Sequence, residues 1–143
     1  MPFDYKPETD SFKISNSPVA GPDVYCNEIF GTMASQVDKS PLTSSLFLLD
    51  GASTSAPLKY TYDETGVVLQ GNLTIKDAET GVVKTVTEGD TFFIHRGSTI
   101  TFSTTSYGLS FQAASRKPNT SESDSAGEET PSGRTNVVVR SSL

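Results

Sequence analysis

Two tyrosines and a glutamate alternate along the segment 58–64, which reads Leu-Lys-Tyr-Thr-Tyr-Asp-Glu. Alternate residues of a β-strand point to the same side, so Tyr60, Tyr62 and Glu64 are predicted to share one face. Burial between aromatic rings would raise the pKa of the glutamate towards neutrality, where it can act as a general base or acid. The phenols could donate hydrogen bonds to a developing enolate or carbonyl oxygen. The alternative is a solvated or ion-paired glutamate beside tyrosines that only pack.

His95 is the only histidine of the chain and ends a predicted strand at 91–95. If Phe93 points into the protein, His95 shares its face and could relay a proton to Glu64 near neutral pH. The alternative is an imidazole that faces solvent beside Arg96. We therefore treat His95 as a candidate catalytic residue, together with Glu64 and the two tyrosines.

Further side chains are candidates for contacting a substrate. They are polar or large apolar residues on predicted strands: Lys59, Gln70, Phe93, Ile100, Phe102, Phe111 and Gln112. Lys59 would point inward only if the register of its strand slipped by one residue. Which side of each strand faces a cavity is not determined by the sequence.

The elements that must position these residues are short β-strands. Alternating or apolar runs bounded by Gly, Asp, Asn, Ser or Pro predict strands at 24–30, 45–49, 58–64, 67–75, 82–87, 91–95, 98–103 and 107–114. Thr65-Gly66 is expected to break the chain between the third and fourth of these strands. No segment has a convincing helical period, so an all-β barrel or sandwich is predicted.

The length of 143 residues predicts one domain with three parts. Residues 1–22 form a polar arm with one possible edge strand, residues 23–116 form the barrel, and residues 117–143 form a polar, low-complexity tail. The tail is expected to be disordered or loosely held. Its β-prone end, 136–140, could pair with an exposed strand edge.

Two motifs resemble those of the cupins, which are small β-barrel proteins. Glu64 is followed seven residues later by Gly71, and Gly89-Asp90 opens an apolar run that ends at Gly97. The residue sequence of both motifs most resembles that of the single-domain cupins of the ethanolamine-utilisation (EutQ-like) type. The resemblance implies a jelly-roll β-barrel, and small cupins of this kind often form homodimers.

Metal-dependent cupins hold Fe, Mn, Zn or Ni through two histidines and a glutamate of the first motif and a histidine of the second. The corresponding positions here are Leu58, Tyr60, Glu64 and Ile100. Since no imidazole is present and a divalent metal usually takes three or four N, O or S donors, no tightly bound metal and no other cofactor is expected.

Composition excludes several classes of partner. A formal net charge of −6 without a cluster of Lys and Arg argues against nucleic acid and anionic membranes. A single cysteine, Cys26, allows no internal disulfide and is expected to be a small core residue. Without a signal peptide or an apolar run of about 20 residues, a cytoplasmic protein is expected.

These features lead to one hypothesis and two alternatives. The first is a metal-independent cupin that binds a small organic molecule in its barrel and catalyses a proton transfer, such as an isomerisation, dehydration or cyclisation. The second is a non-catalytic ligand-binding or assembly module. The third is a metal-dependent cupin with unusual ligands.

Overall fold

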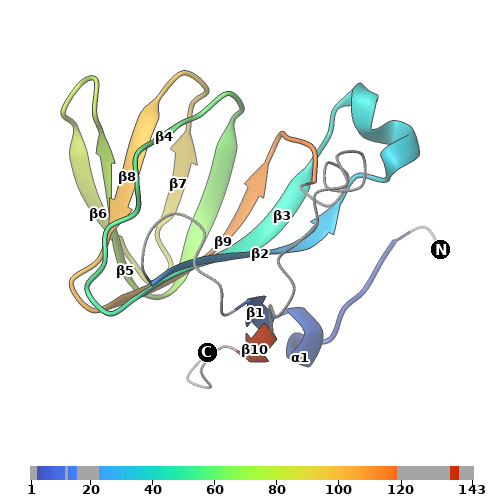
Figure 1. Cartoon of the computed structure of the whole chain (residues 1–143), viewed down its shortest axis with the longest axis horizontal. Helices are drawn as coiled ribbons and strands as arrows, with labels where there is room; N and C mark the ends of the chain where they lie inside the picture. The colour runs from blue at the N-terminus through green and yellow to red at the C-terminus, as the bar shows by residue number, and fades with distance from the viewer. Residues whose placement is uncertain (1–2, 12, 16–22, 119–135, 139–143) are drawn as a thin grey trace.

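The computed structural model describes residues 3–11, 13–15, 23–118 and 136–138. Within these residues the regular structure is almost entirely β-strand, arranged as one curled sheet and a separate strand pair (Figure 1). The all-β prediction is confirmed. No helix in the described part of the chain is both long enough and apolar enough to cross a membrane.

The strands follow the predicted order, and most of their bounds lie within two residues of the prediction. The elements are α1 (Glu8–Ser11), β1 (Lys13–Ser15), β2 (Val24–Gly31), the 3₁₀ helix η1 (Ala34–Lys39), β3 (Thr43–Asp50), β4 (Leu58–Lys59), β5 (Glu64–Asp77), β6 (Val83–Thr87), β7 (Thr91–Ile94), β8 (Thr99–Ser103), β9 (Tyr107–Ala114) and β10 (Asn136–Val138).

The predicted break at Thr65-Gly66 is wrong. β5 begins at Glu64 and runs through both residues, whereas the chain bends earlier, between β4 and Glu64. The start of β5 stays extended because it pairs with β9 on one edge and with β7 on the other. Gly66 suits this position because a Cβ atom there would lie 2.5 Å from Cζ of Phe92, so the missing side chain leaves room for the ring.

β5 belongs to two layers, and its curvature creates the interior of the protein. Its first half pairs with β9 and β7, and β9 continues through β3 to β2; we call this layer the first wall. Its second half pairs with β8 and β6, and β8 pairs with β4; we call this layer the second wall. The two walls face each other across a common core (Figure 1).

The core between the walls is apolar and aromatic in its middle. Phe102 of the second wall lies with its ring centroid 4.9 Å from that of Phe47 in the first wall. The fully or nearly buried members are Val24, Phe47, Leu49, Tyr60, Val68, Leu73, Val86, Ile94, Ile100 and Phe102. A smaller cluster on the other side of the first wall contains Ile29, Leu46 and Leu109. The first wall therefore carries buried apolar residues on both faces.

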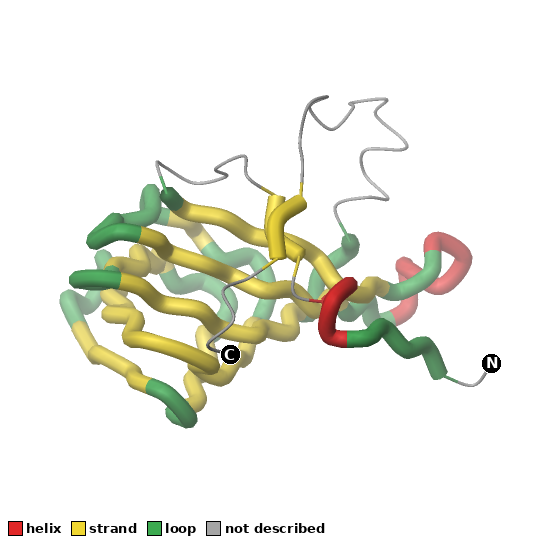
Figure 2. Tube along the Cα trace, turned by 90° about the horizontal axis from the view of Figure 1, so that it is seen from below, coloured by secondary structure: helices red, strands yellow, loops and turns green. Residues whose placement is uncertain are grey.

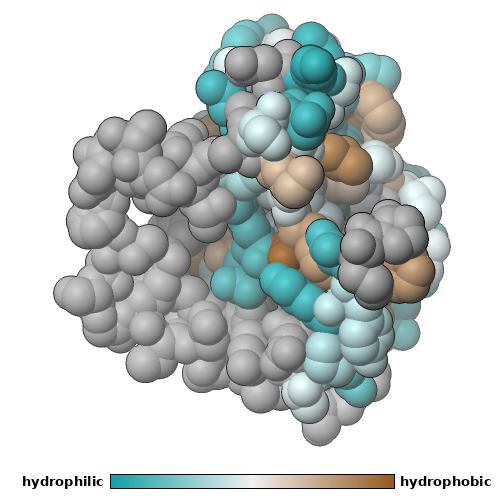
Figure 3. Space-filling model, turned by 90° about the vertical axis from the view of Figure 1, so that its right-hand side faces the viewer, coloured by the Kyte–Doolittle hydropathy of each residue, from teal (hydrophilic) through white to brown (hydrophobic). Residues whose placement is uncertain are grey.

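The strands near the two ends of the chain, β1 and β10, pair with each other outside the curled sheet. β10 pairs antiparallel with β1, with Asn136 opposite Ser15 (Figure 2). β1 also contacts β2 at the edge of the first wall. The rest of the predicted tail beyond Pro118 lies outside the described residues. On the side of the molecule that carries η1, apolar residues lie in separate groups among hydrophilic ones (Figure 3).

We expect Gly71→Ala to destabilise the protein more than Gly81→Ala. Both glycines have positive φ, 74° and 77°, so alanine is strained at either position. At Gly71 a Cβ atom would in addition overlap the carbonyl oxygen of Tyr107 on β9, whereas nothing lies within 4 Å at Gly81. Gly81→Ala should cost about 1 kcal/mol and Gly71→Ala about 2 kcal/mol or more, measured by urea unfolding. Equal losses would show that the close approach of β5 and β9 is not a constraint.

Candidate functional site

Glu64 faces the interior at one end of the first wall. Its neighbours across the strand pairs are Ile94 of β7 and Ala114 of β9, both buried. Directly opposite residues of an antiparallel pair lie side by side on one face, so these two side chains flank the carboxyl group and exclude water from it. Only 5% of Glu64 is exposed.

Tyr60 and Tyr62 lie in the bend that leads into β5 and complete this site. The hydroxyl of Tyr60 hydrogen-bonds to the carboxyl group of Glu64. Tyr60 is 4% exposed, and its ring centroid lies 5.2 Å from that of Tyr62 in an edge-to-face arrangement. The structure therefore brings together the three residues that the spacing in the sequence selected.

Backbone contacts fix the bend. The amide of Tyr60 donates to the carbonyl of Ser98 at 2.8 Å, and the amide of Gly97 donates to the carbonyl of Tyr60 at 2.7 Å. Asp63 accepts from the backbone amide of Arg96 at 2.9 Å and from its guanidinium at 3.1 Å. These contacts with the loop after β7 hold the tyrosines against Glu64, although 58–64 is not one continuous strand.

Burial controls the protonation of the site. It raises the pKa of Glu64, and the Tyr60 hydrogen bond and the charge of Arg116 offset part of this rise. Burial and the nearby carboxylate raise the pKa of Tyr60, so this phenol stays neutral and donates. Among the described residues, Oε1 of Glu64 has no hydrogen-bond partner. Tyr60 therefore interacts with the carboxyl group, and Oε1 is available to exchange a proton.

A polar cluster lies beside Glu64 on the same inner face of the first wall. It consists of Cys26, Ser45, Ser110 and Gln112, whose positions follow from the register of β2, β3 and β9. Nε2 of Gln112 donates to Oγ of Ser110 at 3.1 Å, and the thiol of Cys26 hydrogen-bonds to Ser45. Gln112 was a candidate for contacting a substrate, and the structure places it on this inner face, 4% exposed.

An ion pair that the sequence did not reveal closes this end of the interior. Nη1 of Arg116 donates to Oε2 of Glu28 at 2.8 Å, and the guanidinium Cζ lies 5.8 Å from the ring centroid of Tyr62. A signal was present in the sequence, since Glu28 alternates with Val24 and Cys26 and must share their inward face. A buried carboxylate requires a cation or hydrogen-bond donors, but the pattern does not say which.

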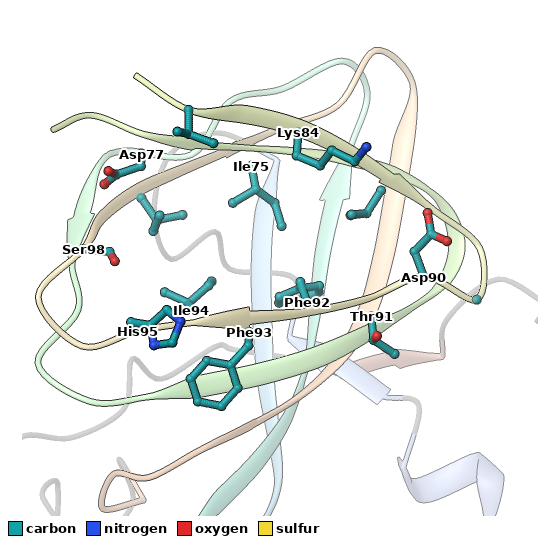
Figure 4. A pocket seen from close by; sticks show the side chains of 14 residues that line it. Ile75, Asp77, Lys84, Asp90, Thr91, Phe92, Phe93, Ile94, His95 and Ser98 are labelled. Carbon is teal, nitrogen blue, oxygen red and sulfur yellow. The ribbon is translucent and has the colours of Figure 1, made fainter. Parts of the chain in front are cut away.

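A cleft opens between the walls on the side of β6 and β7 and measures about 760 Å³ (Figure 4). The two strands diverge from their connecting turn, one along each wall. The floor of this lateral cleft is apolar and consists of Ile75, Val86, Phe92, Ile94 and Ile100; polar side chains at its rim include Asp77, Lys84, Asp90, His95 and Ser98. Ile94 belongs both to this floor and to the surroundings of Glu64.

At the end of β7, Ile94 and not His95 points to the same side as Glu64. The ladder pairs Glu64 with Ile94, so Phe93 lies opposite exposed Thr65 and is itself 54% exposed. Figure 4 shows Ile94 and Phe93 on opposite sides of the strand, and both residues line the lateral cleft. His95 is exposed at the rim, with its ring 4.8 Å from that of Phe93. The proposed relay from His95 to Glu64 therefore has no support from this arrangement.

Three further substrate-contact candidates lie outside the interior. Phe111 is 37% exposed and alternates with the inward Ser110 and Gln112. A register shift in β5 between Val68 and Gln70 places Gln70 opposite Leu109, on the other face of the first wall. Lys59 is exposed and donates to Glu79 and to the carbonyl of Gly97. Ile100 and Phe102 are both buried in the core, and only Ile100 borders the lateral cleft.

The residues at the metal-ligand positions of cupins do not fit a metal ion. Leu58 is 48% exposed, Ile100 is an apolar core residue, and Tyr60 is a neutral donor to Glu64. In the described part of the chain no group of three or more His, Cys, Asp or Glu side chains could hold a metal. A single carboxylate is a poor ligand set for a divalent cation.

We expect the thiol of Cys26 to be unreactive in the folded protein. Burial raises its pKa to about 11 from an ordinary value of 9.0. Because the thiolate is the reactive form, alkylation by iodoacetamide at pH 8 should be about 100-fold slower in the folded protein than in urea. The rate is measured by mass spectrometry on this single cysteine. A folded-state rate close to that of the unfolded chain would contradict the enclosed environment described above.

Comparisons with known proteins agree with this architecture. The family model of the ethanolamine utilisation protein EutQ matches residues 31–113, which is more than half of the chain. A putative ethanolamine utilization protein Q from Salmonella typhimurium LT2 is 24% identical, with a TM-score of 0.54 over 66% of this chain and 71% of that one. No curated protein matches the chain.

Two further solved structures share the fold at lower identity. An RmlC-like cupin from Shewanella frigidimarina NCIMB 400 is 15% identical, with a TM-score of 0.61 over 84% of this chain and 95% of that one. The polyketide cyclase RemF from Streptomyces resistomycificus is 15% identical, with a TM-score of 0.64 over 81% and 82%. The predicted cupin-type fold is confirmed, and the chain belongs to the family of the ethanolamine utilisation protein EutQ.

Proposed function

We propose that this protein is a metal-independent cupin that binds a small, largely apolar organic molecule between its two walls and catalyses a proton transfer on it. The observation that supports the proposal is the buried Glu64 carboxyl group. Tyr60 aligns it, burial raises its pKa, and its Oε1 has no partner among the described residues. A carboxyl group of this kind is suited to general base and general acid catalysis near neutral pH.

The chemistry would proceed through an enolate. Ionised Glu64 removes a proton from a carbon atom next to a carbonyl group, and the electron pair of that C–H bond moves to the carbonyl oxygen. Tyr62 donates a hydrogen bond to the oxygen that becomes negative. Return of the proton to a different atom gives an isomerisation. If the carbon atom next to the enolate carries a hydroxyl group, this group leaves with the proton held by Glu64 as water, which gives a dehydration and restores the carboxylate. Negative charge passes from Glu64 to the substrate and back, so the total charge is unchanged.

The lateral cleft is the proposed binding place of the apolar part of the substrate. Its volume of about 760 Å³ is in the range of small-molecule sites, and its floor is formed by aliphatic and aromatic side chains. The floor residue Ile94 lies directly opposite Glu64. RemF is a polyketide cyclase on a similar fold, and cyclisation is one of the reactions that a carboxyl group in this position could support.

Ligand binding without catalysis is the second candidate. It is favoured by the small exposure of Glu64 and Tyr60, because Ile94 separates the carboxyl group from the open part of the cleft. A substrate would have to displace this side chain to reach Oε1. The homodimer implied by the resemblance to small cupins stays a prediction.

We predict that the protein accelerates hydrogen–deuterium exchange next to the carbonyl group of apolar ketones, and that Glu64→Gln removes this activity. The probe is 2-tetralone in D₂O, a bicyclic ketone with acidic C–H bonds, and the exchange is followed by proton NMR. Loss of the general base should lower the catalysed rate by about 100-fold or more. Glu79→Gln changes an exposed glutamate in the same way and should have no effect.

Each outcome of this experiment separates the candidates. Equal exchange rates for the wild type and Glu64→Gln would contradict the catalytic role of Glu64. Saturable binding of the ketone without faster exchange would support the non-catalytic candidate. Tyr60→Phe should reduce the rate less than Glu64→Gln, since it changes the alignment and basicity of the carboxyl group but keeps the base.

We also predict that Glu64 makes stability depend on pH. Its raised pKa means that the folded state binds the proton more tightly than the unfolded chain. The stabilisation is therefore complete below the unfolded pKa and is lost as the pH rises through the folded pKa. Between about pH 4 and pH 8 the unfolding free energy of Glu64→Gln should rise by about 1–3 kcal/mol relative to the wild type. A difference in urea unfolding that stays constant with pH would contradict this.

A further inference from the structure

Arg116 and Glu28 form an ion pair in which little of either side chain is exposed. They are 88 residues apart in the chain, and Nη1 of Arg116 lies 2.8 Å from Oε2 of Glu28. The two side chains are only 17% and 15% exposed. Taking both charges out of water is costly, and replacing such a pair by apolar residues is often neutral or stabilising. The pair is thus poorly explained by stability alone.

The guanidinium is held in a fixed place between Glu28 and the tyrosines. Nη1 also donates to the carbonyl of Lys117 at 3.1 Å, and the hydroxyl of Thr43 donates to the carbonyl of Arg116 at 2.8 Å. On its other side, Cζ lies 5.8 Å from the ring centroid of Tyr62. A cation at this distance from an aromatic ring is attracted by its face. Arg116 is therefore anchored by Glu28 of β2, by Thr43 of β3, by the carbonyl of Lys117 and by Tyr62.

A continuous set of contacts leads from this ion pair to Glu64. Glu28 holds Arg116, Arg116 contacts Tyr62, Tyr62 packs on Tyr60 at 5.2 Å, and Tyr60 hydrogen-bonds to Glu64. The positive end of the ion pair faces the tyrosines and the carboxyl group. The negative end lies on the far side, on β2.

We propose that Arg116, oriented by Glu28, is a positioning residue that sets the charge of the Glu64 site: its guanidinium favours the ionised carboxylate and holds Tyr62 as a hydrogen-bond donor. The consequence for catalysis rests on the proposed function of Glu64.

Among the residues that the structure describes, the other groups around Glu64 do not offer a competing cation. Cys26 and Glu28 face it from β2, Tyr60 and Tyr62 from the bend, and uncharged Ile94 and Ala114 from β7 and β9. The charge of Arg116 lowers the pKa of Glu64 against the larger effect of burial. It also lowers the pKa of the Cys26 thiol, whereas Glu28 raises it. The reactivity of the Cys26 thiol therefore reports on the electrostatic effect of the same two charges.

The test compares two variants that break the same ion pair from opposite ends. Arg116→Gln removes the positive charge, and Glu28→Gln removes the negative charge and leaves the guanidinium uncompensated. The titration of Glu64 is followed by carbon-13 NMR of the side-chain carboxyl groups, with Glu64→Gln used to assign its signal. We expect the titration midpoint to rise in Arg116→Gln and to fall in Glu28→Gln, each by about half a pH unit or more.

A purely structural role would move both midpoints in the same direction, because both variants lose the same contact. Shifts of equal sign, or no shift in either variant, would overturn the proposal. Arg116→Lys keeps the charge and should return the midpoint most of the way to that of the wild type. If Arg116→Gln fails to fold, the Glu28→Gln and Arg116→Lys arms still decide the outcome.

Alkylation of Cys26 provides an independent readout. With iodoacetamide at pH 8, Arg116→Gln should react about three-fold or more slowly than the wild type, and Glu28→Gln about three-fold or more quickly. Neither readout uses turnover, so the two proposals can fail separately. Opposite shifts together with no catalysed ketone exchange would refute the proposed function and keep the role of Arg116. Ketone exchange that depends on Glu64, without opposite shifts of the midpoint, would refute the role of Arg116 and keep the proposed function.

Discussion

The structure depends on keeping one carboxyl group inside an apolar interior. Removing Glu64 from water costs free energy unless its oxygens find partners, and the surrounding elements supply them only in part. Tyr60 donates one hydrogen bond, and the charge of Arg116 acts on the carboxyl group from beyond Tyr62, while Ile94 and Ala114 exclude solvent. The result is a carboxyl group whose pKa is raised above that of an exposed glutamate. A shift in this direction favours acid–base chemistry.

The curvature of β5 produces both this site and the cleft next to it. Because one strand passes from the first wall to the second, the walls diverge on the side where β6 and β7 separate, and the lateral cleft opens there. Glycines make this path possible: Gly66 leaves space for Phe92, and Gly71 allows the backbone to approach Tyr107. The aromatic contact between Phe47 and Phe102 fills the middle of the interior. The space for a ligand is therefore at the side, beside Ile94.

The sequence predicted the strands well because each is short, β-prone and bounded by turn residues; β9 has the predicted bounds, Tyr107–Ala114. Its clearest error was the break at Thr65-Gly66, a pair that signals a turn locally but is kept extended by ladders on both edges of β5. The sequence left the facing of Phe93 and His95 open. Alternation says only that two residues share a side, and the ladder that places Ile94 opposite Glu64 decides which side is inside.

The sequence by itself determined the class of fold, the family motifs and the loss of imidazoles at the metal-ligand positions, because these depend on residue types and spacings along the chain. It also determined that Glu64 and two tyrosines could act together, since they alternate within one short segment. Only the tertiary structure decided that Gln70 and Phe111 lie on the other face of the first wall, because register and a shift within β5 fix strand facing. It alone joined Arg116 to Glu28, since no local pattern relates residues 88 positions apart.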